Sequence, residues 1–171
     1  MPLDPVAVFA LLLLGGAVAV DGTSYGQFMI SRPFVAAALA GWIVGEPAQG
    51  AMIGVVLEAL HLPVLPVGAA KHPEGGPTAV AAGAVYALTS GTSAALLVLT
   101  VLALGLEWVG GESVRLMRIA NVRIIQAGQG FSDDETLERR HLAAIGVDFV
   151  RGMLLVASGG VALYAASRYL L

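Results

Sequence analysis

The sequence predicts an all-α integral membrane protein, a compact helical bundle with short, broken or re-entrant helices. Of its 171 residues, 57% are hydrophobic and 12% are charged, whereas a soluble domain carries about 25% charged residues. Charges, prolines and glycines also interrupt the apolar stretches at short intervals. Finally, runs of small residues such as GGAVAV and AAALAG let helix backbones approach closely in lipid.

The apolar stretches are too short for a set of ordinary transmembrane helices. They comprise residues 5–20, 33–45, 48–57, 75–106 and 152–167, and Ser90–Ser93 divides the fourth near its middle. Crossing a hydrocarbon core takes about 20 helical residues. Broken helices occur at membrane depth where protein or a water-filled cavity satisfies the freed backbone groups, and transporters place binding sites at such breaks. Short spans in a tilted or thinned bilayer are the alternative.

Charge divides the chain into three regions. We expect a core membrane region with broken helices over residues 1–106, a charged linker or helical arm over 107–149, and a C-terminal transmembrane helix over 150–171. Of the chain's nine basic residues, the arm holds the arginines at positions 115, 118, 123, 139 and 140. The positive-inside rule therefore places the arm on the cytoplasmic side. The first segment lacks the basic start of a signal peptide, so we expect it to be retained.

Several function classes are disfavoured by composition and motifs. A net charge of −3 provides no basis for nucleic-acid binding. The chain has no cysteine, which excludes disulfides and thiolate metal sites. No nucleophile elbow, Walker loop or dinucleotide-binding motif occurs, so we expect no catalytic residue and no cofactor. An intramembrane metalloenzyme is a further alternative. It would need a bound metal, and the spacing of the Glu and His residues matches no strong metal-binding motif.

Glu58 is the most conspicuous charged residue, because it lies in the apolar stretch GVVLEALHL. A carboxylate at the bilayer centre costs several kcal/mol and usually pairs or lines a pathway. It is either a ligand or proton group in a cavity, or a group at a helix end near the lipid headgroups.

The stretch KHPEGGPTA, residues 71–79, places Lys71, His72 and Glu74 between two apolar stretches. Its prolines exclude a continuous helix. It is either an interfacial loop or a non-helical stretch inside the protein, where Lys71 and Glu74 pair or reach polar groups of a substrate. Further upstream, Arg32 precedes Pro33, a residue favoured at the first position of a helix.

These features follow one another in an order that resembles the membrane subunit IIC of the mannose/sorbose-type sugar phosphotransferase system. The ordered elements are Arg32-Pro33, Gly45-Glu46, Leu57-Glu58, Gly68-Ala69-Ala70 and Pro73-Glu74. The resemblance covers residues 20–106 well and the remainder more loosely. It implies a multi-pass protein of the bacterial cytoplasmic membrane with re-entrant helical hairpins.

The resemblance also implies partners. IIC subunits pair with a membrane subunit IID, assemble as trimers of such pairs and carry a hexose-type sugar across the lipid bilayer. The cytoplasmic subunits IIA and IIB relay phosphate, IIB phosphorylates the sugar, and IIC carries no phosphorylated residue. By match to the family, Gln27, Arg32, Glu58 and Glu74 are expected to line the sugar site. Lys71 and His72 are added by their position alone.

The sequence departs from the family in ways that leave an alternative open. Gly26 and Gln27 stand where the family commonly carries acidic residues, and Pro66 stands where an asparagine is frequent. The chain is also shorter than typical members. The alternative is therefore a non-transporting structural or regulatory membrane partner of a IID-like subunit.

Overall fold

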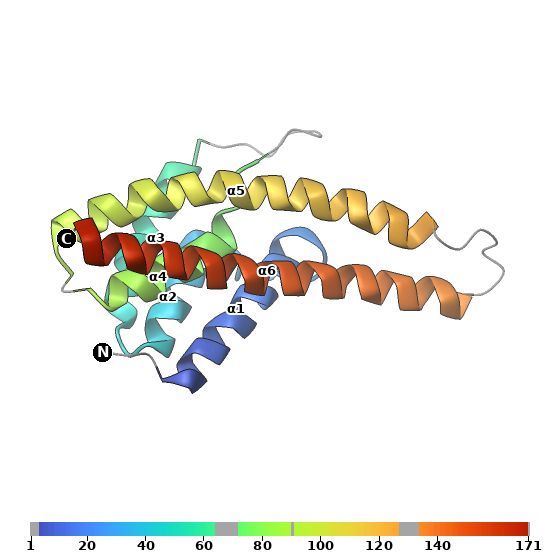
Figure 1. Ribbon diagram of the computed structural model, residues 1–171, viewed down its shortest axis with the longest axis horizontal. Helices are drawn as coiled ribbons and strands as arrows, with labels where there is room; N and C mark the ends of the chain where they lie inside the picture. The colour runs from blue at the N-terminus through green and yellow to red at the C-terminus, as the bar shows by residue number, and fades with distance from the viewer. Residues whose placement is uncertain (1–3, 64–71, 90, 127–133, 171) are drawn as a thin grey trace.

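The computed structural model describes residues 4–63, 72–89, 91–126 and 134–170, which form six α-helices (Figure 1). The helices are α1 (Pro5–Thr23), α2 (Pro33–Ile43), α3 (Pro47–His61), α4 (Gly75–Ala87), α5 (Ser93–Gln126) and α6 (Asp134–Leu170). The described residues contain no strand, and the predicted all-α class is confirmed.

The helices comprise three long ones and the short ones that the sequence predicts. Three helical stretches, residues 5–23, 93–124 and 137–170, are long and apolar enough to cross a membrane. Helices α2, α3 and α4 have 11, 15 and 13 residues, which is below the roughly 20 needed to span. The chain is therefore a multi-pass membrane protein with three short helices between its first and second long helices.

The ends of the short helices follow local sequence signals. Pro33 and Pro47 stand at the first positions of α2 and α3, where the missing N–H of proline costs nothing. The predicted break near Ser90–Ser93 is confirmed: α4 ends at Ala87 and α5 begins at Ser93. The Thr92 hydroxyl accepts a hydrogen bond from the Ala95 N–H at 3.2 Å, which satisfies a free donor at the start of α5.

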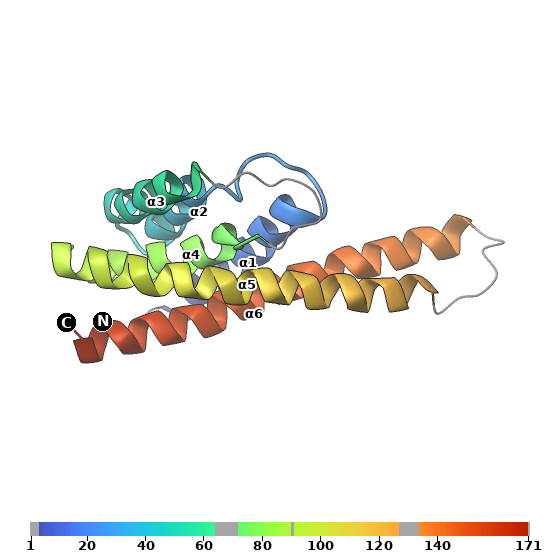
Figure 2. The ribbon, with the colours of Figure 1, turned by 90° about the horizontal axis from the view of Figure 1, so that it is seen from above.

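Helix α4 lies at the centre of the bundle. Every residue from Gly76 to Ala87 is buried, and the helix packs against α1, α2, α3, α5 and α6. In Figure 2, α2 and α3 lie together on one side of α4, whereas the long helices α5 and α6 run side by side on the other. Because α4 carries no charge and mostly small side chains, it can be enclosed on all sides without leaving a charge unpaired.

Small residues set how closely the helices approach one another. A Cβ on Gly83 of α4 would lie 2.7 Å from the Cα of Ala37 in α2, and a Cβ on Gly50 of α3 would lie 2.8 Å from the Cα of Gly41. On the other side of the bundle, a Cβ on Gly152 of α6 would lie 2.5 Å from the Cβ of Ala19. These crossings require glycine, as expected for helix packing in lipid.

The far ends of α5 and α6 project beyond the rest of the molecule (Figures 1 and 2). Both helices run without interruption past residues 106 and 150, where the charge pattern placed boundaries between regions. Those boundaries therefore fall within helices, and the division into three regions stays a prediction.

Candidate functional site

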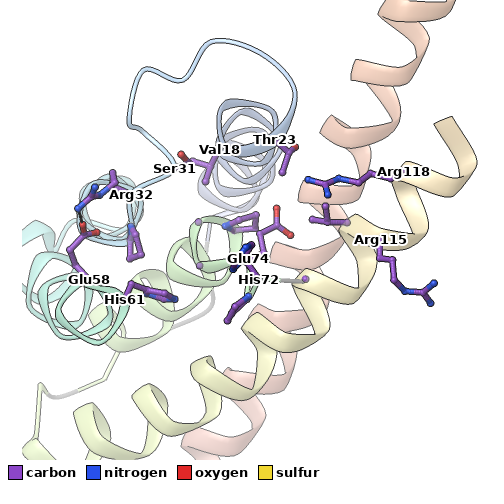
Figure 3. Close-up of a pocket in the computed structure, with 18 of the residues that line it drawn as sticks. Val18, Thr23, Ser31, Arg32, Glu58, His61, His72, Glu74, Arg115 and Arg118 are labelled. Atoms are coloured by element: carbon purple, nitrogen blue, oxygen red, sulfur yellow. Dashed lines mark ion pairs between the residues drawn. The ribbon is translucent and has the colours of Figure 1, made fainter. Parts of the chain in front are cut away.

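A cavity of about 820 Å³ lies where α2 begins, α3 ends and α4 begins, and residues 111–122 of α5 close one side. Its polar lining includes Arg32, Glu58, His61, His72 and Glu74. Figure 3 shows the pair Arg32 and Glu58 on one side of the cavity and His72 and Glu74 near its centre. The broken helices thus meet at a polar hollow, in the arrangement expected of transporters.

The structure brings four of the six predicted site residues to this one cavity. Arg32, Glu58, His72 and Glu74 line it. Gln27 does not: it is exposed in the loop between α1 and α2, with a φ of 53°. Lys71 lies outside the described residues.

The loop that carries Gln27 is held by Asp21, which is 3% exposed. The Asp21 carboxylate accepts hydrogen bonds from the backbone N–H groups of Phe28 and Ser31, the latter at 2.9 Å. The loop also needs positive φ at Gly26 (103°) and Met29 (67°). Asp21 therefore shapes the chain that leads into Arg32.

Glu58 is paired rather than isolated. It forms an ion pair with Arg32, and its second oxygen accepts the Phe34 N–H at 3.3 Å. The side chain of Glu58 is 18% exposed and that of Arg32 is 48% exposed. Because Glu58 lies in the last turn of α3 and Arg32 caps α2, this pair joins the two short helices at the edge of the cavity.

Glu74 is engaged by an arginine that the sequence analysis did not select. Both carboxylate oxygens of Glu74 accept hydrogen bonds from Arg151 of α6, Oε1 at 2.6 Å from Nη2. Arg151 also binds Asp148, from Nε at 2.9 Å and from Nη2 at 2.7 Å. The side chains of Glu74, Arg151 and Asp148 are 10%, 9% and 0% exposed. This buried charge cluster lies directly behind the cavity.

A second pair that was not predicted from the sequence joins His61 to Glu107. The Nε2 atom of His61 lies 3.0 Å from Oε2 of Glu107, and its Nδ1 lies 2.8 Å from the Leu57 carbonyl oxygen. An imidazolium ring suits this geometry, because both of its nitrogens donate hydrogen bonds. Consistently, the hydrogen bond that His61 donates to Glu107 raises the pKa of His61, which lies outside the three candidate spans, above its ordinary value of 6.5.

A signal for these missed residues was present in the sequence. Glu107 is the one charge between Ser93 and Gly111, and Asp148 and Arg151 lie three positions apart in an otherwise apolar stretch. Residues at that spacing share a helix face. Like Glu58, these residues are charges within apolar stretches, where a charge usually pairs or lines a pathway.

The His61–Glu107 pair predicts a pH dependence of stability. Because the pKa of His61 is higher in the folded state, its protonation stabilises the folded protein. This stabilisation is complete below the ordinary pKa of 6.5 and is lost as the pH rises through the raised pKa. Between pH 6.5 and pH 9, the Tm of the purified protein should fall more than the Tm of His61→Gln. Melting curves at several pH values test this, and parallel pH dependences for the two proteins would contradict it.

Metal ligands do not gather at this site. Within the described parts of the chain, no group of three or more His, Cys, Asp or Glu side chains is arranged to hold a metal ion. The Nε2 atom of His72 is buried without a hydrogen-bond partner there.

A membrane-embedded helical bundle with short helices meeting at a polar cavity defines a membrane transport subunit. The family model of the sorbose-specific IIC component of the phosphotransferase system matches residues 6–169, and the chain belongs to this family. The predicted resemblance is confirmed: the chain is a IIC-type subunit of a phosphotransferase-system sugar transporter.

A solved structure supports the fold. The chain is similar to a chain in the cryo-electron microscopy structure of the mannose transporter ManYZ in complex with microcin E492, with a TM-score of 0.80 and 16% sequence identity. The match covers 99% of this chain and 68% of that chain. Comparison with curated proteins found no match.

Proposed function

We propose that this IIC-type subunit binds its sugar in the cavity at the start of α4, where Glu58 and Glu74 accept hydrogen bonds from sugar hydroxyl groups. The observation that carries this proposal is that two carboxylates, one at the end of α3 and one just before α4, line one cavity, each held by an arginine. Arginine pairing offsets part of the cost of placing each carboxylate away from water. The same pairing holds the two carboxylates in fixed positions, where both can accept hydrogen bonds from the sugar.

The chemistry of the cavity fits a neutral, hydroxylated cargo. A carboxylate offers about four acceptor positions, and Arg151 occupies one on each oxygen of Glu74. Glu58 is similarly engaged once at each oxygen, by Arg32 and by the Phe34 N–H. Both carboxylates therefore retain acceptor positions for O–H donors. A cavity of about 820 Å³ also falls within the range of small-molecule sites.

We further infer the partners and the setting from family membership. The chain pairs with a IID-like membrane subunit in the bacterial cytoplasmic membrane, as part of trimers of such pairs, and works with cytoplasmic IIA and IIB subunits. Large exposed apolar side chains on several helices support contact with lipid and with a membrane partner. They include Phe9, Trp42, Leu97, Leu154 and Val161.

Glu58→Gln and Glu74→Gln should each weaken binding of the transported sugar at least tenfold. A hydrogen bond to a charged group contributes about 1.5–3 kcal/mol, and about 1.4 kcal/mol corresponds to a factor of ten. Titration calorimetry with a panel of hexoses, on the complex purified through a tag on this chain, measures the effect. Co-purification of a second membrane subunit tests the proposed partner in the same preparation.

The matched control is Glu46→Gln, because Glu46 is exposed at the start of α3 and does not line the cavity. It should leave affinity unchanged. Unchanged affinity in both Glu58→Gln and Glu74→Gln would remove the proposed site. A complex that assembles but binds no hexose would instead favour the alternative, a non-transporting membrane partner.

A further inference from the structure

We propose that Arg151 is a positioning residue of the sugar site, which acts on the sugar solely by orienting the Glu74 carboxylate. Asp148 in turn holds Arg151. This inference rests on the proposed function of the cavity and extends it to two residues of α6 that do not line the cavity.

The hydrogen bonds of Arg151 show why it acts through Glu74. A guanidinium has five N–H donors. The structure gives Arg151 five bonds: Nε and Nη2 to Asp148 Oδ1, Nη2 to Glu74 Oε1, Nη1 to Glu74 Oε2, and Nη1 to Ser113 Oγ at 2.9 Å. No donor remains for a ligand, so Arg151 cannot bind the sugar without giving up a bond in the network.

Glu74 depends on Arg151 for its orientation. It precedes the first residue of α4 in an extended conformation, and its side chain makes no capping hydrogen bond to the helix. Its backbone N–H donates to the Glu107 carbonyl oxygen at 2.9 Å, which fixes the main chain alone. The side chain has several rotatable bonds, and the two-pronged contact with Arg151 holds them in one arrangement.

Asp148 connects this arrangement to α1. Its Oδ2 accepts hydrogen bonds from the hydroxyls of Thr23 and Ser24 at the end of α1, while its Oδ1 binds Arg151. Asp148 is fully buried, so water does not compete for these bonds. The end of α1, α6 and the start of α4 are thereby joined in one continuous network behind the cavity wall.

The test is Arg151→Lys in the full complex, with sugar affinity as the first readout. Lysine keeps the charge but cannot form the two parallel bonds to a carboxylate. Affinity should fall about tenfold, as expected when one charge-assisted hydrogen bond of the sugar is lost. Arg168→Lys is the matched control, because Arg168 is exposed near the end of the same helix, and it should have no effect.

A double-mutant cycle separates positioning from a general structural role. If Arg151 acts through Glu74, Arg151→Lys should cost no further affinity in the Glu74→Gln background. An equal loss in both backgrounds would overturn the proposal, because Arg151 would then act independently of Glu74.

A second readout does not require sugar binding. The chain has no cysteine, so Ser31→Cys provides a single thiol on the cavity wall. A Cβ on Gly76, two residues after Glu74, would lie 2.9 Å from the Ser31 carbonyl oxygen, so Ser31 reports on the start of α4. Arg151→Lys should speed maleimide labelling of this thiol severalfold, and Arg168→Lys should not.

The two readouts distinguish the proposals. If the wild-type complex binds no hexose, the proposed function fails, and the labelling rate then tests whether Arg151 holds the start of α4, where Glu74 lies. If Arg151→Lys changes neither affinity nor labelling, the positioning role is wrong while the sugar site stands.

Discussion

Arg151→Leu should lower the free energy of unfolding by about 3–5 kcal/mol, the usual cost of removing one partner from a buried ion pair. The substitution leaves the carboxylates of Glu74 and Asp148 buried without their cation, since their side chains are 10% and 0% exposed. We expect a large fall in Tm, measured by thermal unfolding in detergent, or loss of the assembled protein in size-exclusion chromatography.

Two further variants make this prediction specific. Arg115→Leu removes the arginine of another ion pair at the same helical spacing, with Glu112, but that pair is exposed and its loss should leave Tm unchanged within error. The triple variant Glu74→Gln, Asp148→Asn, Arg151→Leu leaves no buried charge in the cluster and should recover most of the lost stability. An Arg151→Leu protein as stable as Arg115→Leu would contradict the prediction.

Gly83→Ala should destabilise the protein by at least about 1–3 kcal/mol, the range for overpacking a close-packed interior. The new methyl group would lie 2.6 Å from the carbonyl oxygen and 2.7 Å from the Cα of Ala37. Both are backbone atoms of α2, so the clash is relieved only if two packed helices separate. Thermal unfolding in detergent measures the change.

Gly160→Ala is the matched control, and its effect should have the opposite sign. A Cβ on Gly160 meets no atom within 4 Å, so the substitution should stabilise α6 by about 0.5–1 kcal/mol through reduced backbone entropy. If both variants moved Tm in the same direction, the close approach of α4 and α2 would not be the feature that requires glycine.

Part of the cavity could be predicted from the sequence. The family match predicts Arg32, Glu58 and Glu74 as site residues and position alone predicts His72, and the structure places all four at one cavity. For Glu58 the residues alone point the same way, because an ionisable group in an apolar stretch is expensive unless it has a local purpose. Whether they bind the sugar stays a prediction.

The partners of these residues could not be predicted. Glu58 was expected to pair or to line a pathway, but nothing in the sequence indicated that Arg32 would meet it. Arg151 is separated from Glu74 by almost half the chain, and no local pattern encodes a contact at that distance. Gln27 was predicted to line the site from its match to the family. In the structure, it is exposed in the loop held by Asp21 and does not line the cavity.

The sequence by itself determined the membrane class, the all-α fold and the short helices, because these follow from hydropathy and from local breakers such as Pro33 and Pro47. The tertiary structure alone decided which charges meet. It also decided that α4 is the central helix, because only the folded bundle shows which small residues approach within contact distance. Local sequence sets where a helix begins and ends, whereas the pairing of buried charges depends on helices that are distant in sequence and adjacent in space.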